Sequence, residues 1–148
     1  MLVHCATQLP CPAAMVWDEV LKPSLLHEVI WPVVVIRGED WPTRWSERAA
    51  LRCRLFLFGL IPLGPRTLRF ERVDPDAREI RTRETDALCR RWDHCIRVRE
   101  LPDGQTRYSD TVEVDARWLT PLVRLFAVCF YRYRQRRWQR VARRLMAK

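Results

Sequence analysis

The chain has 148 residues, 48% of them hydrophobic, which suits one domain spanning residues 1–148 with a sizeable core and excludes a disordered chain. It carries 27 basic and 18 acidic residues for a formal net charge of +9, and the excess lies after Asp115, where nine Arg and one Lys occur without a single acid. No run approaches the roughly 18 apolar residues of a membrane span, no secretory signal is visible, and the six Cys form no C-x-x-C pair. We therefore expect a cytoplasmic protein with reduced thiols, no metal site and no cofactor.

The first part of the chain predicts one strand and two short helices. Residues 2–9 have strand composition and are followed by two prolines. Residues 13–21 and 24–30 carry apolar residues at helical spacing, and prolines bound both segments. Ser24 suits the N-cap of the second helix.

The middle of the chain predicts a succession of strands in an antiparallel meander. Alternating or β-branched patterns separated by turn residues indicate strands at 33–38, 47–58, 66–73, 78–85, 91–101 and 105–114. With the strand at 2–9, these segments predict a sheet of six to seven strands.

The last two of these strands have a predictable register. The link Pro102-Asp103-Gly104 fits a three-residue hairpin loop, with Gly104 in the left-handed position. Pairing Leu101 with Gln105 then places Val98 opposite Tyr108, Ile96 opposite Asp110 and His94 opposite Val112. Trp92, His94, Tyr108 and Asp110 would share one mostly apolar, inward face.

The basic terminal segment predicts one long helix from Trp118 to Met146. Its apolar stripe is Leu119, Val123, Phe126, Phe130, Trp138, Val141 and Leu145. The stripe must be buried, and the sheet supplies the surface, which indicates an α+β architecture. Most arginines of the segment lie away from the stripe: Arg132, Arg136, Arg140, Arg143 and Arg144. Arg134 lies on it.

This order of elements resembles the START-like superfamily, also called helix-grip or SRPBCC, which includes polyketide cyclases/dehydrases and lipid-transport domains. The phrases that carry the resemblance are PCPAAMVWDEVLKPSLLHEVIWP, RWDHCIRVRELPDGQTRYSDTVEV and FAVCFYRYRQRRWQRVARRL, which lie along nearly the whole chain. It implies a curved antiparallel sheet wrapped around the C-terminal helix, two short helices after the first strand, and an apolar cavity between sheet and helix. None of these phrases is a catalytic signature, so the resemblance implies no single activity.

Three polar residues of the predicted inward face are the candidates for chemistry. His94 and Asp110 are diagonal neighbours in the predicted register, and Glu84 is in phase with them on the previous strand. A carboxylate beside a histidine can orient a ligand or transfer a proton. The same residues can equally form a buried hydrogen-bonded pair that serves only the fold.

The leading hypothesis is non-catalytic binding of a small apolar or amphipathic ligand between sheet and helix. Its candidate pocket residues are Trp92, His94, Tyr108, Asp110, Phe126, Phe130 and Arg134. Arg134 either orients an anionic ligand head or extends to solvent. One alternative is an aromatase/cyclase-like enzyme that acts on a polyketide-type substrate through His94 with Asp110 or Glu84. The other is an interaction module whose basic helix face binds RNA or another nucleic acid, an anionic membrane or an acidic protein. That face can also be simply solvated, and the oligomeric state stays open.

A second apolar feature is the segment LFLFGLIPLG at residues 55–64. An apolar lid, a ligand gate or a membrane-touching loop near one end of the cavity would be formed by Phe56, Phe58, Leu60, Ile61 and Leu63. Alternatively, the segment finishes a strand and packs under the helix.

Overall fold

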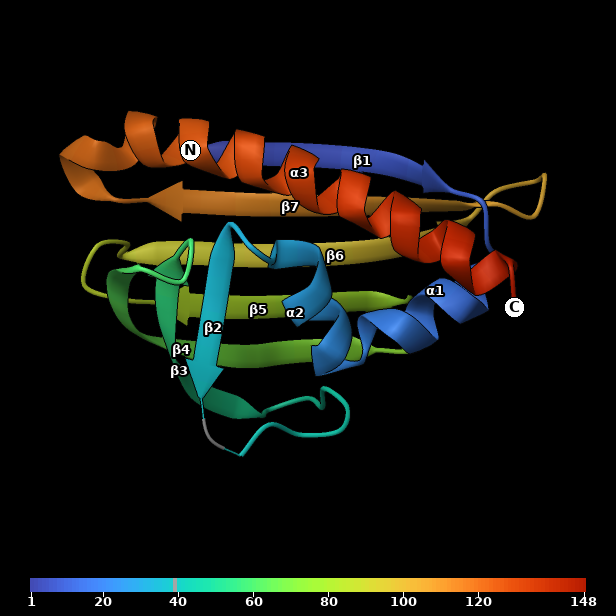
Figure 1. Ribbon diagram of the computed structural model, residues 1–148, viewed down its shortest axis with the longest axis horizontal. Helices are drawn as coiled ribbons and strands as arrows, with labels where there is room; N and C mark the ends of the chain where they lie inside the picture. The colour runs from blue at the N-terminus through green and yellow to red at the C-terminus, as the bar shows by residue number, and fades with distance from the viewer. Residues whose placement is uncertain (39) are drawn as a thin grey trace.

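A curved antiparallel sheet closed by a long C-terminal helix makes up the computed structural model, which describes residues 1–38 and 40–148 (Figure 1). The elements in chain order are β1 Leu2–Leu9, α1 Ala13–Val20, α2 Pro23–Ile30, β2 Val34–Gly38, β3 Ala50–Leu57, β4 Ile61–Asp74, β5 Glu79–Thr85, β6 Arg91–Glu100, β7 Thr106–Asp115, the 3₁₀ turn η1 Arg117–Leu119 and α3 Thr120–Met146. This is the predicted α+β helix-grip order, with two short helices after the first strand.

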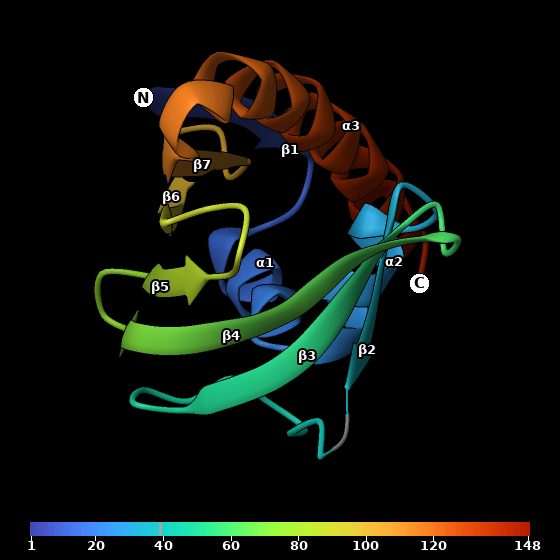
Figure 2. The ribbon, with the colours of Figure 1, turned by 90° about the vertical axis from the view of Figure 1, so that its left-hand side faces the viewer.

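The sheet has seven strands in the order β1-β7-β6-β5-β4-β3-β2, and every neighbouring pair is antiparallel. Strands β2 to β7 form the predicted meander, and β1 pairs with the last strand. Figure 2 shows the sheet curving strongly from β7 towards β2, with α1 and α2 on its concave side and α3 across the β1–β7 end. The curvature separates α3 from β3 and β4 and leaves space between them that side chains must fill or line.

The β6–β7 hairpin has the predicted register. The backbone N–H of Leu101 donates to the carbonyl of Gln105 at 2.8 Å, and Gly104 has a φ of 79°. Val98 faces Tyr108, Ile96 faces Asp110 and His94 faces Val112. The loop chemistry therefore determines which polar side chains share the inner face of these two strands.

Two local predictions differ from the structure. Helix α2 begins at Pro23, with Lys22 in the N-cap position, so Ser24 is not the N-cap. The fixed φ of proline suits the first helical position, and it moves the helix start one residue earlier. Strand β4 begins at Ile61 and not at residue 66, because a tight turn with left-handed backbone at Phe58 and Gly59 (φ 53° and 71°) sends the chain straight back.

Helix α3 contains 27 residues, about 40 Å of helix. Its C-terminal half closes a core against β1, β7 and α2. Trp138 is 1% exposed there and its ring lies 5.6 Å from that of Tyr108. Its N-terminal half is different, because Leu122 and Leu125 are more than 60% exposed. Phe126 of the predicted stripe is 36% exposed there as well, so the stripe packs in the core towards its C-terminal end and is more open towards its N-terminal end.

The outer face of α3 carries the basic charge. Arg132, Arg136, Arg140 and Arg143 are exposed, and Arg144 forms an ion pair with Glu28 of α2 at 2.8 Å. Among the described residues, no helix is both long and apolar enough to span a membrane.

Candidate functional site

A cavity of about 670 Å³ lies between the concave face of the sheet and helices α1, α2 and α3. Leucine, isoleucine, valine and aromatic side chains form most of its wall. Its polar lining residues are Arg66, Thr82, Glu84, Asp86, His94, Tyr108, Tyr131 and Arg134. This size and composition are typical of small-molecule sites, which range over roughly 300–1,000 Å³ and have mostly apolar walls with a few placed polar groups.

The cavity opens beside the N-terminal half of α3. The exposed residues of its wall mark the opening: Leu88 of the β5–β6 loop, and Leu122, Leu125, Phe126 and Cys129 of α3. Figure 2 views this end, with the β5–β6 loop and the start of α3 facing the reader. Apolar side chains at an opening let a hydrophobic molecule enter without crossing a polar barrier.

The segment 55–64 divides between the wall and the surface. Leu55, Leu57 and Leu63 line the cavity. Leu60 is 83% exposed and Ile61 is 55% exposed, so these two do not pack under the helix. A lid or gate built from them stays a prediction.

His94 and Asp110 form a buried polar pair on the inner face of β6 and β7. Nε2 of His94 lies 2.8 Å from Oδ1 of Asp110, and the side chains are 7% and 1% exposed. Tyr108 donates to the same carboxylate oxygen at 3.2 Å, and Gln135 of α3 donates to Oδ2 at 3.2 Å. Burial by itself would raise the pKa of Asp110, but the charge of Arg134 and the hydrogen bonds from His94 and Gln135 lower it below its ordinary value.

The structure places Asp110 behind the cavity wall and not in it. His94 and Tyr108 line the cavity, whereas Asp110 does not. Its carboxylate therefore acts on the cavity through the two side chains that it holds. Strand parity predicts on which face of the sheet a residue lies but not how far it lies from the cavity. The position of Asp110 behind the wall was therefore not predictable.

Arg134 is a buried cation in the wall of the cavity. Its side chain is 6% exposed, so the alternative in which it extends to solvent is wrong. The guanidinium carbon lies 5.0 Å from the centre of the Tyr131 ring. Burial alone would lower the pKa of Arg134, but the carboxylate of Asp110, followed by Tyr108, Tyr131 and Glu84, raises it above its ordinary value. The guanidinium therefore stays charged inside the protein.

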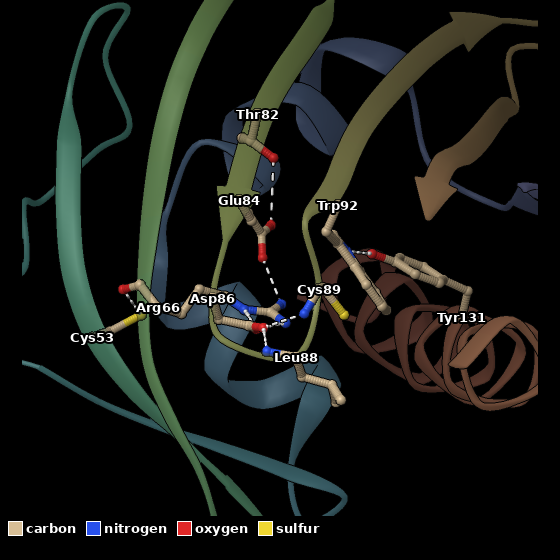
Figure 3. A network of polar contacts seen from close by, with 9 residues as sticks. All are labelled: Cys53, Arg66, Thr82, Glu84, Asp86, Leu88, Cys89, Trp92 and Tyr131. Carbon is tan, nitrogen blue, oxygen red and sulfur yellow. Dashed lines mark hydrogen bonds and ion pairs between the residues drawn. The ribbon is translucent and has the colours of Figure 1, made fainter. Parts of the chain in front are cut away.

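A second charged cluster lies nearer the opening (Figure 3). Arg66 of β4 donates through Nε to Asp86 at 2.9 Å and through Nη1 to Glu84 at 2.9 Å. Its guanidinium also lies 5.2 Å from the centre of the Trp92 ring, and Asp86 accepts backbone N–H bonds from Leu88 and Cys89. Glu84 thus pairs with Arg66. The predicted alternative, in which Glu84 pairs with His94, is wrong.

Sequence reasoning missed Arg66, Asp86, Tyr131 and Gln135. Two of the four had a usable signal. Arg66 precedes the inward residues Leu68 and Phe70 by even steps, so strand parity places it on the inner face. Gln135 lies four residues after Tyr131, one helical turn along the buried side of α3.

The aromatic candidates lie in the cavity wall. Trp92 is 5% exposed and donates through Nε1 to the Tyr131 hydroxyl at 3.3 Å. Phe130 is 9% exposed and stacks on Phe126 with ring centres 5.5 Å apart. Across residues 1–38 and 40–148, no three His, Cys, Asp or Glu side chains come together in a group that could hold a metal ion.

The sequence matches the model of a known domain family over residues 7–142, and that family is described as a domain of unknown function, DUF8410. The chain belongs to the DUF8410 family. No curated protein matches its sequence significantly.

Solved structures show that the DUF8410 chain has a START-like fold. It is similar to a START superfamily protein from Mycobacterium smegmatis, with a TM-score of 0.68, 14% identity and coverage of 97% of this chain and 98% of that one. It is also similar to protein CV1439 from Chromobacterium violaceum (TM-score 0.71, 15% identity, 95% and 96% covered). Protein TTHA0849 from Thermus thermophilus aligns with a TM-score of 0.71 at 14% identity, covering 100% and 99% of the two chains. At such identities the likeness concerns the fold, and it confirms the predicted helix-grip architecture.

Proposed function

We propose that this DUF8410 domain binds a small hydrophobic or amphipathic molecule in the cavity between its sheet and α3, without converting it. The observation that carries the proposal is the cavity itself. It has a volume of about 670 Å³, mostly apolar walls and an apolar opening. A START-like fold supports the same function, because its architecture places a cavity between sheet and helix.

The energetics favour an occupied cavity. Water is a poor filling for apolar walls, because it finds few hydrogen-bond partners there. A hydrophobic ligand removes the apolar wall from water and stabilises the folded state.

Native mass spectrometry and dye binding test the proposal. Freshly purified protein should carry a co-purifying small molecule, and delipidated protein should bind the neutral dye Nile red with one-to-one stoichiometry. Protein that carries no small molecule and does not bind Nile red would contradict the proposal.

A matched pair of α3 variants locates the site. Val123 lines the cavity, and the neighbouring Arg124 is exposed and outside the wall. Val123→Trp should fill the opening and abolish Nile red binding, whereas Arg124→Trp adds the same side chain outside and should leave it intact. Equal binding by both variants would place the dye elsewhere.

The His94–Asp110 contact favours a second candidate, proton transfer to or from a bound ketone-type ligand as in an aromatase/cyclase-like enzyme. His94 lines the cavity, and Asp110 behind it holds the ring at 2.8 Å. The two functions differ in the response to His94→Gln. If the protein is an enzyme, the His94→Gln variant should still bind the co-purified molecule but no longer convert it. If the protein only binds, that molecule should keep the same mass whether residue 94 is His or Gln.

A further inference from the structure

Among the described residues that line the cavity, Arg134 is unusual because its charge is buried without a hydrogen-bond partner. Its Nε is buried and has no partner, and the guanidinium forms no hydrogen bond with any other described residue. A buried donor without an acceptor costs about 1–3 kcal/mol, and more when it is charged. Buried polar groups in native proteins nearly always have partners, so an acceptor is missing from the protein alone.

The nearby carboxylates do not supply that acceptor. Asp110 accepts from His94 and Tyr108 on one oxygen and from Gln135 on the other. Glu84 accepts from Arg66. Both attract Arg134 through space and keep it charged, but their hydrogen bonds are directed elsewhere.

The other buried arginine of the cavity is fully engaged by the protein. Arg66 donates to Asp86 through Nε and Nη2 and to Glu84 through Nη1. The guanidinium fork of Arg66, its Nε, Nη1 and Nη2 donors, is therefore not available to a ligand. The fork of Arg134 has no acceptor among the residues that the structure describes and is open to a ligand. The ring of Tyr131 holds the Arg134 guanidinium in place, with its carbon 5.0 Å from the ring centre.

We propose that the ligand is a monocarboxylic acid with an apolar tail, and that its carboxylate binds the open fork of Arg134. This inference rests on the proposed ligand-binding function. A carboxylate matches the planar guanidinium with two parallel hydrogen bonds, which a hydroxyl or a single carbonyl oxygen cannot do. The tail direction follows from α3, since Arg134 lies three turns deeper along the helix than Leu122 at the opening, roughly 18 Å away. The head then lies deep and the tail fills the leucine-rich part towards the opening.

Matched ligands test the head group on the unmodified protein. Dodecanoate and dodecanol share one tail, and each is titrated against bound Nile red at neutral pH. A carboxylate at Arg134 makes dodecanoate bind roughly 10- to 100-fold more tightly than dodecanol. Equal affinities would overturn the inference and leave the proposed function intact, whereas the absence of binding by both molecules and by Nile red would contradict the proposed function itself.

Variants at Arg134 test the anchor. Arg134→Met leaves Asp110 buried without its countercharge and can unfold the protein, so the double variant Arg134→Met with Asp110→Asn removes both charges together. In the double variant, dodecanoate should lose its advantage while dodecanol binds as before. Arg134→Lys keeps the charge but not the fork and should retain only part of the advantage.

Arg124→Met is the control for general positive charge near the opening, because Arg124 is exposed on α3. It should leave the dodecanoate advantage unchanged. An advantage that persists in the double variant, or that disappears in Arg124→Met, would overturn the assignment to Arg134.

Discussion

His94 Nε2 and Asp110 Oδ1 lie 2.8 Å apart on neighbouring strands, and both side chains are buried. Because an ionised carboxylate only accepts, the ring N–H of His94 is the donor. The same carboxylate attracts Arg134 and accepts from Gln135 on α3. Asp110 thus joins sheet and helix behind the cavity wall.

The first prediction concerns acid stability. The folded-state pKa of Asp110 lies below the ordinary value of 3.8, so its charge contributes stability that is present above that pH and is lost as the pH falls through the folded pKa. Asp110→Asn should lower the free energy of unfolding at pH 7 by about 3 kcal/mol or more and flatten its decline below about pH 4. Urea unfolding at several pH values measures both effects. The exposed Asp76→Asn should keep the decline of the wild type, and an equally steep decline in Asp110→Asn would contradict the role of Asp110.

The second prediction concerns Arg66, which holds Glu84 and Asp86 together with side chains 13%, 14% and 4% exposed. Arg66→Met leaves two buried carboxylates facing each other and should cost about 3–5 kcal/mol of unfolding free energy. Arg83→Met is the matched control, since Arg83 is 55% exposed and lies 3.3 Å from Glu71. It should cost less than about 1 kcal/mol. Equal losses in the two variants would show that the Arg66 cluster contributes no more than a surface ion pair.

Local chemistry made much of this fold predictable from the sequence. The Pro102-Asp103-Gly104 loop determined the β6–β7 register, and with it the contact between His94 and Asp110. Strand alternation and the helical stripe gave the order and types of the elements. These signals are local or have a short period, so one sequence contains them in full.

The features that the sequence did not predict depend on contacts between distant segments, and the periodicity of a sequence does not encode such contacts. The sequence placed Arg134 on the apolar stripe but left open whether it is buried or extends to solvent, because its burial depends on the compensating charge of Asp110 on a distant strand. Glu84 pairs with Arg66 because the β4–β5 register places Glu84 opposite Leu68, two residues along the strand from Arg66. The depth of Asp110 behind the wall likewise depends on the packing of α3 and not on strand parity.

The third prediction compares two tryptophans at opposite ends of the terminal segment. Trp138 is 1% exposed against Tyr108, whereas Trp118 is 83% exposed. Trp138→Ala should lower the free energy of unfolding by about 3–5 kcal/mol, and Trp118→Ala should change it by less than about 0.5 kcal/mol. Chemical denaturation of both variants measures the difference. Similar values would contradict the burial of Trp138 in the core between α3 and the sheet.

The fourth prediction uses the cysteines as reporters of the cavity. Cys53, Cys89 and Cys129 all line it, but Cys129 is exposed and the other two are buried. Burial, chiefly, raises the pKa of Cys53 and of Cys89 to about 11, so little reactive thiolate forms at pH 8. Cys129 should therefore react first with a disulfide reagent, and saturating dodecanol should slow that reaction severalfold. In Cys129→Ser the fast phase should disappear, and a fast phase that dodecanol leaves unchanged would show that the bound molecule does not reach this part of the wall.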